Sequence, residues 1–274
     1  MIALKQTNLI KAQKNLSNVH FSCQIRNESF CKLLEESLIK HADTIQSLTI
    51  GWKPITKVLS HLKNLISLKL ELSLAYDKSW NHLENNLSLP VLKILKAKLV
   101  PSKILVGLIE NTKDLTEISI QLQNDANNER LIQTIHQNSS NLKYLKVQLT
   151  KNIVSEFELL LINCQNLDEL VIVTGKEKFD WNILFKTLTK SSPTTLFKFK
   201  FHFYFDERPS LKSLELFFNN WKGRHPMLLQ TFQIDVPLTN EYSNLFEKHK
   251  TKGIIKTYNV NDYFEDFEWI QKKN

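Results

Sequence analysis

Histidine is the residue type in this sequence best suited to bind a metal ion or to transfer a proton, but its spacing suits neither role. No two histidines follow the His-x-x-x-His pattern that places both imidazoles on one helix face, and no His-Glu motif occurs. We therefore predict no metal site and no zinc ion. The histidines are spread along the whole chain: His20, His41, His61, His82, His136, His202, His225 and His249.

The other groups that could do chemistry also lack a working arrangement. Cys23, Cys31 and Cys164 form no paired motif, so we interpret them as small buried hydrophobic residues in a chain from a reducing compartment. The 5 glycines lie far apart and cannot build a phosphate-binding loop. Neighbouring carboxylates such as Glu35 and Glu36 are typical of charged helix surfaces. We predict no catalytic residues, no cofactor and no enzymatic activity.

The charge of the chain permits an acidic partner. Its formal net charge is +8 and its pI about 9.2. Specific nucleic-acid recognition is disfavoured, because guanidinium groups make the bidentate contacts to phosphate and base edges and arginine is rare here. Nearly all the cations are lysine, and the arginines are Arg26, Arg130, Arg208 and Arg224.

The elements that must position any site follow from one repeated pattern, Leu-x-x-Leu-x-Leu, in which other aliphatic or aromatic residues are tolerated. Its apolar and polar residues alternate, which predicts short, half-buried strands. We expect these strands near 18–22, 46–50, 66–71, 92–98, 116–121, 143–149, 168–173, 197–203, 230–235 and 255–260. The pattern starts at Leu16, Ile45, Leu65, Leu92, Leu115, Leu142, Leu167, Leu196, Leu229 and Ile255.

Between the strands the apolar period changes to that of a helix, as in 102–109 and 153–164. A strand and helix of about 27 residues cannot bury both apolar faces alone, so neighbouring units must stack around one core. We predict an α/β solenoid with a concave parallel sheet, convex helices and about ten irregular repeats over residues 1–260. A doubly wound α/β domain is the alternative, but no glycine-rich turn follows any strand. Residues 261–274 are predicted to be a capping helix or a tail.

The strand signature resembles that of the leucine-rich-repeat family. The leucines of LKNLISLKLEL (62–72) and SSNLKYLKVQL (139–149) match its core, and CQNLDEL (164–170) is similar to the cysteine-type repeats of F-box leucine-rich-repeat proteins. The repeat length and the helical connectors are similar to those of the ribonuclease-inhibitor-type horseshoe. Ser73, Val100, Gln123, Thr150 and Gly175 stand where the family places its Asn or Cys.

The resemblance implies a role in the ubiquitin system. F-box proteins of this type bring a substrate, held by the repeats, to a ubiquitin ligase. No F-box is visible, so this chain would be the substrate-reading part, and docking to a Skp1-like protein is not assigned to any residue.

The strand period also predicts where a partner binds, because residues that flank the inward leucines point out of the concave face. Lysine recurs in the central column between the second and third apolar positions, which also holds Gln233. Phe199 and Phe201 are expected in the core. The predicted partner-binding residues are Lys69, Lys96, Lys98, Tyr144, Lys146, Lys198, Lys200 and His202.

We therefore expect a noncatalytic protein-recognition scaffold with an acidic protein partner. The alternative is electrostatic binding of RNA or another anionic surface. The sequence shows no signal peptide and no membrane-spanning run. A monomeric protein of the cytoplasm or nucleus is predicted.

Overall fold

The computed structural model describes most of the chain, namely residues 2–21, 27–72, 80, 87–121, 128–150, 153–174, 179–203, 208–233 and 238–260, with side chains from Thr7 onward. These residues belong to two compact units, Met1–Ser139 and Ser140–Asn274. One solenoid over residues 1–260 stays a prediction. The predicted capping segment 261–274 lies outside the described residues.

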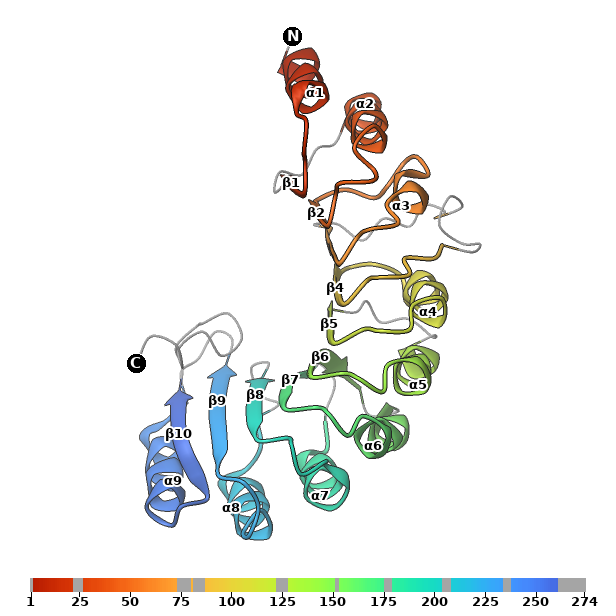
Figure 1. Cartoon of the computed structure of the whole chain (residues 1–274). Helices are drawn as coiled ribbons and strands as arrows, with labels where there is room; N and C mark the ends of the chain where they lie inside the picture. Colours follow the sequence, from red (N-terminus) through yellow and green to blue (C-terminus); the bar gives the residue numbers. More distant parts are fainter. Residues whose placement is uncertain are drawn as a thin grey trace. The chain divides into compact units, whose positions relative to one another are not determined.

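In the N-terminal unit, five parallel strands follow one another in chain order, each paired with its sequence neighbour. The helices lie on one side of these strands (Figure 1). The strands are β1 (Asn18–Phe21), β2 (Ser47–Ile50), β3 (Ser67–Glu71), β4 (Ile94–Lys98) and β5 (Glu117–Gln121). The helices are α1 (Ile2–Ala12), α2 (Glu28–Ile39), α3 (Val58–His61), α4 (Ser102–Glu110) and α5 (Asn128–Asn138).

The C-terminal unit repeats this arrangement with longer strands, again parallel and in chain order. Its helices also lie on one side of its strands (Figure 1). The strands are β6 (Tyr144–Leu149), β7 (Glu169–Thr174), β8 (Lys198–Phe203), β9 (Met227–Gln233) and β10 (Ile255–Val260). The helices are α6 (Val154–Asn163), α7 (Trp181–Ser191), α8 (Leu211–Asn220) and α9 (Asn240–Thr251).

The repeated strand and helix confirm the predicted α/β repeat architecture, with parallel strands that follow chain order in each unit. The inward leucines occupy the expected positions: Leu68 pairs with Leu95, and Leu145 with Leu170, across neighbouring strands. All four side chains are fully buried. A short repeat can bury its strand and helix only against its neighbours, and these leucine pairs form that shared core.

One predicted strand was out of phase. Strand β9 begins at Met227, three residues before the expected start, and Leu229 pairs with Phe199. The cause lies in the apolar run from Met227 to Leu229, which leaves the phase of the alternation undetermined. The central position of this strand is therefore Gln230, which pairs with Lys200, whereas Gln233 pairs with Phe203.

Phenylalanine replaces leucine in the core of the C-terminal unit. Phe199 and Phe201 are fully buried, as predicted. Phe217 of α8 stacks on Phe185 of α7 with ring centroids 4.6 Å apart and meets Phe201 edge to face. Such aromatic pairs add to the stabilisation that comes from burial alone.

Candidate functional site

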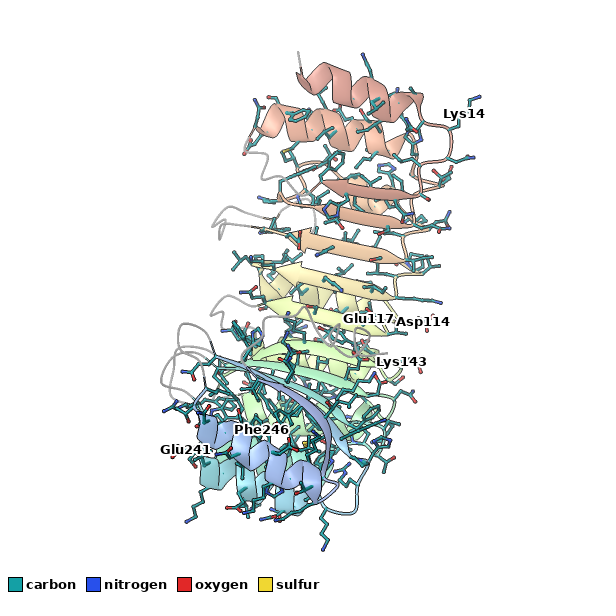
Figure 2. All side chains as sticks on the ribbon, turned by 90° about the vertical axis from the view of Figure 1, so that its left-hand side faces the viewer. Lys14, Asp114, Glu117, Lys143, Glu241 and Phe246 are labelled. Carbon is teal, nitrogen blue, oxygen red and sulfur yellow. The ribbon has the colours of Figure 1, made fainter. Side chains whose placement is uncertain are left out.

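The side of the N-terminal sheet that faces away from the helices carries the first candidate site, which we name the N-terminal face (Figure 2). Its side chains form rows across the strands because parallel pairing aligns equivalent residues. Most of them are half-buried or exposed, and Thr49 is the buried exception. The rows are Asn18, Ser47, Ser67, Ile94 and Glu117; then His20, Thr49, Lys69, Lys96 and Ser119; then Glu71, Lys98 and Gln121.

The three lysines of this face differ in whether a carboxylate is paired with them. Lys69 pairs with Glu71 of its own strand at 2.8 Å, and this carboxylate reduces the repulsion between Lys69 and its neighbour in register, Lys96. Lys96 and Lys98 lie two residues apart on β4 and point to the same side of the sheet. Within the described ranges, neither of them forms a salt bridge. The positive charge of the N-terminal face is therefore concentrated at these two side chains.

The equivalent surface of the second unit, the C-terminal face, is much less accessible. Its central row runs Lys146, Val171, Lys200, Gln230 and Asn259. Lys200 is 1% exposed, and Val171 and Gln230 are 0% exposed. The expectation that Lys200 projects into solvent is therefore wrong.

The other predicted residues of the C-terminal face also depart from an open surface. Tyr144 and His202 are buried, whereas Lys146 is half-buried. Lys198 forms a salt bridge with Glu169 of the neighbouring strand β7 and lies 3.5 Å from Asp168. The sequence pattern identified the side of the sheet for each residue, but it could not show which charges are already paired.

Glu35 corrects a second expectation. The pattern predicts a charged helix surface for both Glu35 and Glu36, but Glu35 is 0% exposed and of the two only Glu36 lies at the surface. The Glu35 carboxylate accepts hydrogen bonds from Trp52 Nε1 at 2.9 Å, from the backbone N–H groups of Ile55 and Thr56 at 3.0 and 2.6 Å, and from Thr56 Oγ1 at 2.5 Å. It therefore ties α2 to the connection between β2 and α3, a structural role.

The two described cysteines, Cys31 and Cys164, are buried, as predicted, whereas Cys23 lies outside the described residues. Burial raises the pKa of Cys164 to about 12. Its thiol stays protonated near neutral pH and is a poor nucleophile.

His249 is a buried titratable group in the C-terminal unit. It lies in the last turn of α9, whose end is closed by Gly253 in the left-handed conformation, with the N–H of Ile254 donating to the His249 carbonyl. Its ring packs 5.0 Å from that of Phe218, and neither ring nitrogen has a hydrogen-bond partner within the described ranges. Burial, followed by Lys252 and Lys248, lowers the pKa of His249, while Glu215 opposes the shift.

We expect this histidine to make the protein less stable in mild acid. Because the folded pKa is lower than the unfolded value near 6.5, the unfolded state binds the proton first. The stability contribution is therefore complete above pH 6.5 and is lost as the pH falls from there through the lowered pKa. Urea unfolding at several pH values should show this loss, and His249→Phe should reduce it. An unchanged pH dependence in that variant would contradict the assignment.

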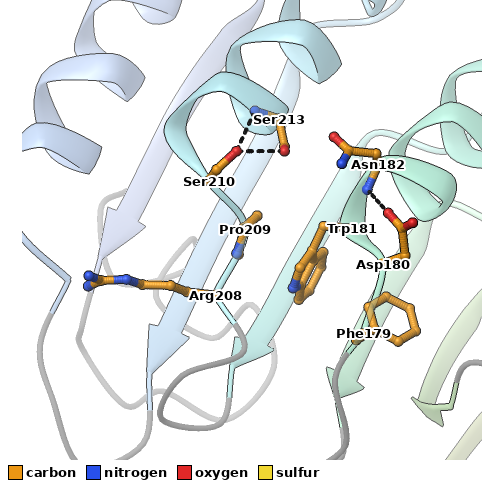
Figure 3. Close-up of a pocket in the computed structure, with 8 residues that line it drawn as sticks. All are labelled: Phe179, Asp180, Trp181, Asn182, Arg208, Pro209, Ser210 and Ser213. Carbon is orange, nitrogen blue, oxygen red and sulfur yellow. Dashed lines mark hydrogen bonds between the residues drawn. The ribbon is translucent and has the colours of Figure 1, made fainter.

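A pocket of about 540 Å³ opens where α7 and α8 begin (Figure 3). Its walls include Trp181 and Arg208, and the residues that cap both helices also line it. Asp180 accepts the N–H groups of Asn182 and Ile183, and Ser210 accepts that of Ser213. These first-turn donors are already satisfied by the protein, so they are not available to an anion.

Within the described residues, no group of three His, Cys, Asp or Glu side chains could hold a metal ion. In the same part of the chain, no helix has both the length and the apolar character required to cross a bilayer. The accessible row of polar side chains that the described residues present is that of the N-terminal face, and such a row can bind a partner.

No protein-family model matches the sequence, and no curated protein matches it. Among solved structures, the chain is similar to the leucine-rich repeat-containing protein LegL7 from Legionella pneumophila, with 12% sequence identity and a TM-score of 0.49 over 90% of this chain and 94% of that chain.

Proposed function

We propose that this chain is a noncatalytic recognition protein whose N-terminal face binds an acidic segment of a protein partner. The observation that carries the proposal is the pair Lys96 and Lys98, which share one face of β4 and form no salt bridge within the described residues. The opposite side of the same strand is closed, since Leu95 and Ala97 are buried. Binding therefore has to take place on the exposed side.

The chemistry of this face favours a carboxylate-bearing partner. The Cα atoms of alternate strand residues lie about 7 Å apart, so the two lysine ammonium groups share one region of the face and repel each other. A partner carboxylate between them would remove that repulsion. Ile94 is half-buried on the same strand and adds apolar area beside the lysines. An extended segment that combines acidic and apolar residues would satisfy both features.

The test is a charge reversal with a matched control. Lys96→Glu combined with Lys98→Glu should reduce capture of acidic protein partners from the native cell by about tenfold or more, because each lost charge contact weakens binding and each new one repels. The control combines Lys32→Glu on α2 with Lys113→Glu after α4, both exposed, and makes the same change in net charge.

Quantitative mass spectrometry of the captured proteins measures the effect. Both double variants should melt close to the unaltered protein, because exposed charges contribute little to stability. Undiminished capture by the β4 variant, or equal losses in both variants, would show that the N-terminal face does not recognise the partner.

The same capture experiment distinguishes binding of an acidic protein from the alternative function, binding of RNA. The formal charge of +8 favours electrostatic binding of RNA as the second candidate. Ribonuclease treatment would remove the captured partners if they are bound through RNA, and binding would fall steeply as salt increases. Both results together would show that the protein binds RNA. Recovery of a Skp1-like protein and a cullin would support the substrate-adaptor role that the F-box resemblance predicts. Size-exclusion chromatography with light scattering tests the predicted monomer.

A further inference from the structure

The accessible positive charge of the N-terminal face lies along a single strand. Ile94, Lys96 and Lys98 follow one another on the side of β4 that points away from the helices. Ile94 and Lys96 are half-buried, and Lys98 is exposed. Among the described residues, no carboxylate is paired with either lysine. Along the strand, the surface is therefore apolar at the first of these positions and cationic at the next two.

The strands on either side of β4 offer a ligand less positive charge. On β3, Lys69 is paired with Glu71 at 2.8 Å. On β5, the equivalent positions hold a carboxylate, a hydroxyl and an amide: Glu117, Ser119 and Gln121. A segment that crossed these strands along one row would meet either Lys96 or Lys98, whereas a segment that follows β4 meets both. The charge distribution therefore favours a ligand that runs along the strand.

The spacing of the two lysines matches that of an extended chain. Alternate residues of a strand lie about 7 Å apart and point to the same side. In an extended ligand, the side chains at positions i, i+2 and i+4 therefore face the sheet with the spacing of Ile94, Lys96 and Lys98. Extended layers that pack face to face cross at about 30°, which displaces the outer positions by about 3 Å. The flexible lysine side chains can span that displacement.

The structure also defines both ends of this row. Leu99, directly after Lys98, has a φ of 58° and breaks the alternation, so the row ends there. At the other end, Ile94 is in register with Glu117 of β5, whose carboxylate disfavours an acidic ligand residue at that position. An apolar ligand residue is therefore expected at Ile94, and acidic residues are expected at Lys96 and Lys98.

We propose that the partner segment of the N-terminal face is extended, runs along β4 and has the spacing apolar-x-acidic-x-acidic, in which x is any residue. Its apolar side chain packs on Ile94, and its two carboxylates lie at Lys96 and Lys98. The inference rests on the proposed function, since it takes an acidic segment as the ligand. It adds the line that the segment follows, its conformation and the positions of its acidic residues. The spacing is the same in either chain direction.

Synthetic peptides provide the first test, with binding to the full chain measured by calorimetry at low ionic strength. One peptide holds a leucine and two aspartates, separated by single serines, between blocked termini. In its control, the last aspartate and the serine before it are exchanged, so one carboxylate points away from the sheet. Both peptides are also made in reverse order. In one of the two orders, the alternating peptide should bind about threefold to fivefold more tightly than its control, because it makes one more charge contact.

A variant of the chain tests the assignment of the second carboxylate. Lys98→Gln should abolish the difference between the alternating peptide and its control, because the last aspartate has lost its partner. Lys113→Gln removes an exposed lysine after α4 and should retain the difference. A difference that persists in Lys98→Gln, or equal binding of peptide and control in both orders, would overturn this inference and leave the proposed function standing. Failure of every peptide to bind would contradict the proposed function as well.

Discussion

Glu35→Ala is expected to lower the free energy of unfolding of the N-terminal unit by about 3–5 kcal/mol, because it leaves several buried donors without an acceptor and opens a cavity. The carboxylate accepts hydrogen bonds from Trp52, Ile55 and Thr56, and the group is inaccessible to water. Urea unfolding measures the loss. Hydrogen exchange should place it in α2 and in the connection between β2 and α3.

Glu36→Ala is the matched control, since it removes the neighbouring carboxylate from an exposed position on the same helix. We expect a change within about 0.5 kcal/mol. Glu35→Gln should fall between the two, because an amide retains one accepting oxygen but places an NH₂ group against some of the donors. Equal effects of Glu35→Ala and Glu36→Ala would show that the buried hydrogen bonds do not stabilise the fold.

Leu145→Ala should cost about 2–5 kcal/mol in the C-terminal unit, as expected for truncating a fully buried leucine. Leu145 lies on β6 and pairs with Leu170 of β7, so the cavity would form in the core that two repeats share. Thermal and urea unfolding followed by circular dichroism measure the effect, and faster hydrogen exchange in β6 and β7 should locate it.

Leu159→Ala provides the comparison within the same unit. Leu159 lies on α6 and is 44% exposed, so its truncation removes little buried area. We expect a change below about 1 kcal/mol, because alanine also favours the helix. If Leu145→Ala destabilised the protein no more than Leu159→Ala, the assignment of Leu145 to the shared core would be wrong.

The strand pattern was sufficient to predict the fold class and the direction of most side chains. Side chains alternate along a strand, so leucines such as Leu68 and Leu95 can be assigned to the core from spacing alone. The same rule placed Lys96 on the opposite face. It did not determine the phase of β9, because Met227, Leu228 and Leu229 are all apolar and the alternation is lost there.

The sequence by itself therefore determined the repeat, the strands and the side of the sheet on which each lysine lies, because these depend on neighbours along the chain. Only the tertiary structure decided which polar groups are accessible or paired. Glu35 is buried by a segment some twenty residues away, and Lys69 and Lys198 meet carboxylates. Burial and ion pairing depend on where the folded chain brings distant residues together, and no local pattern records those distances.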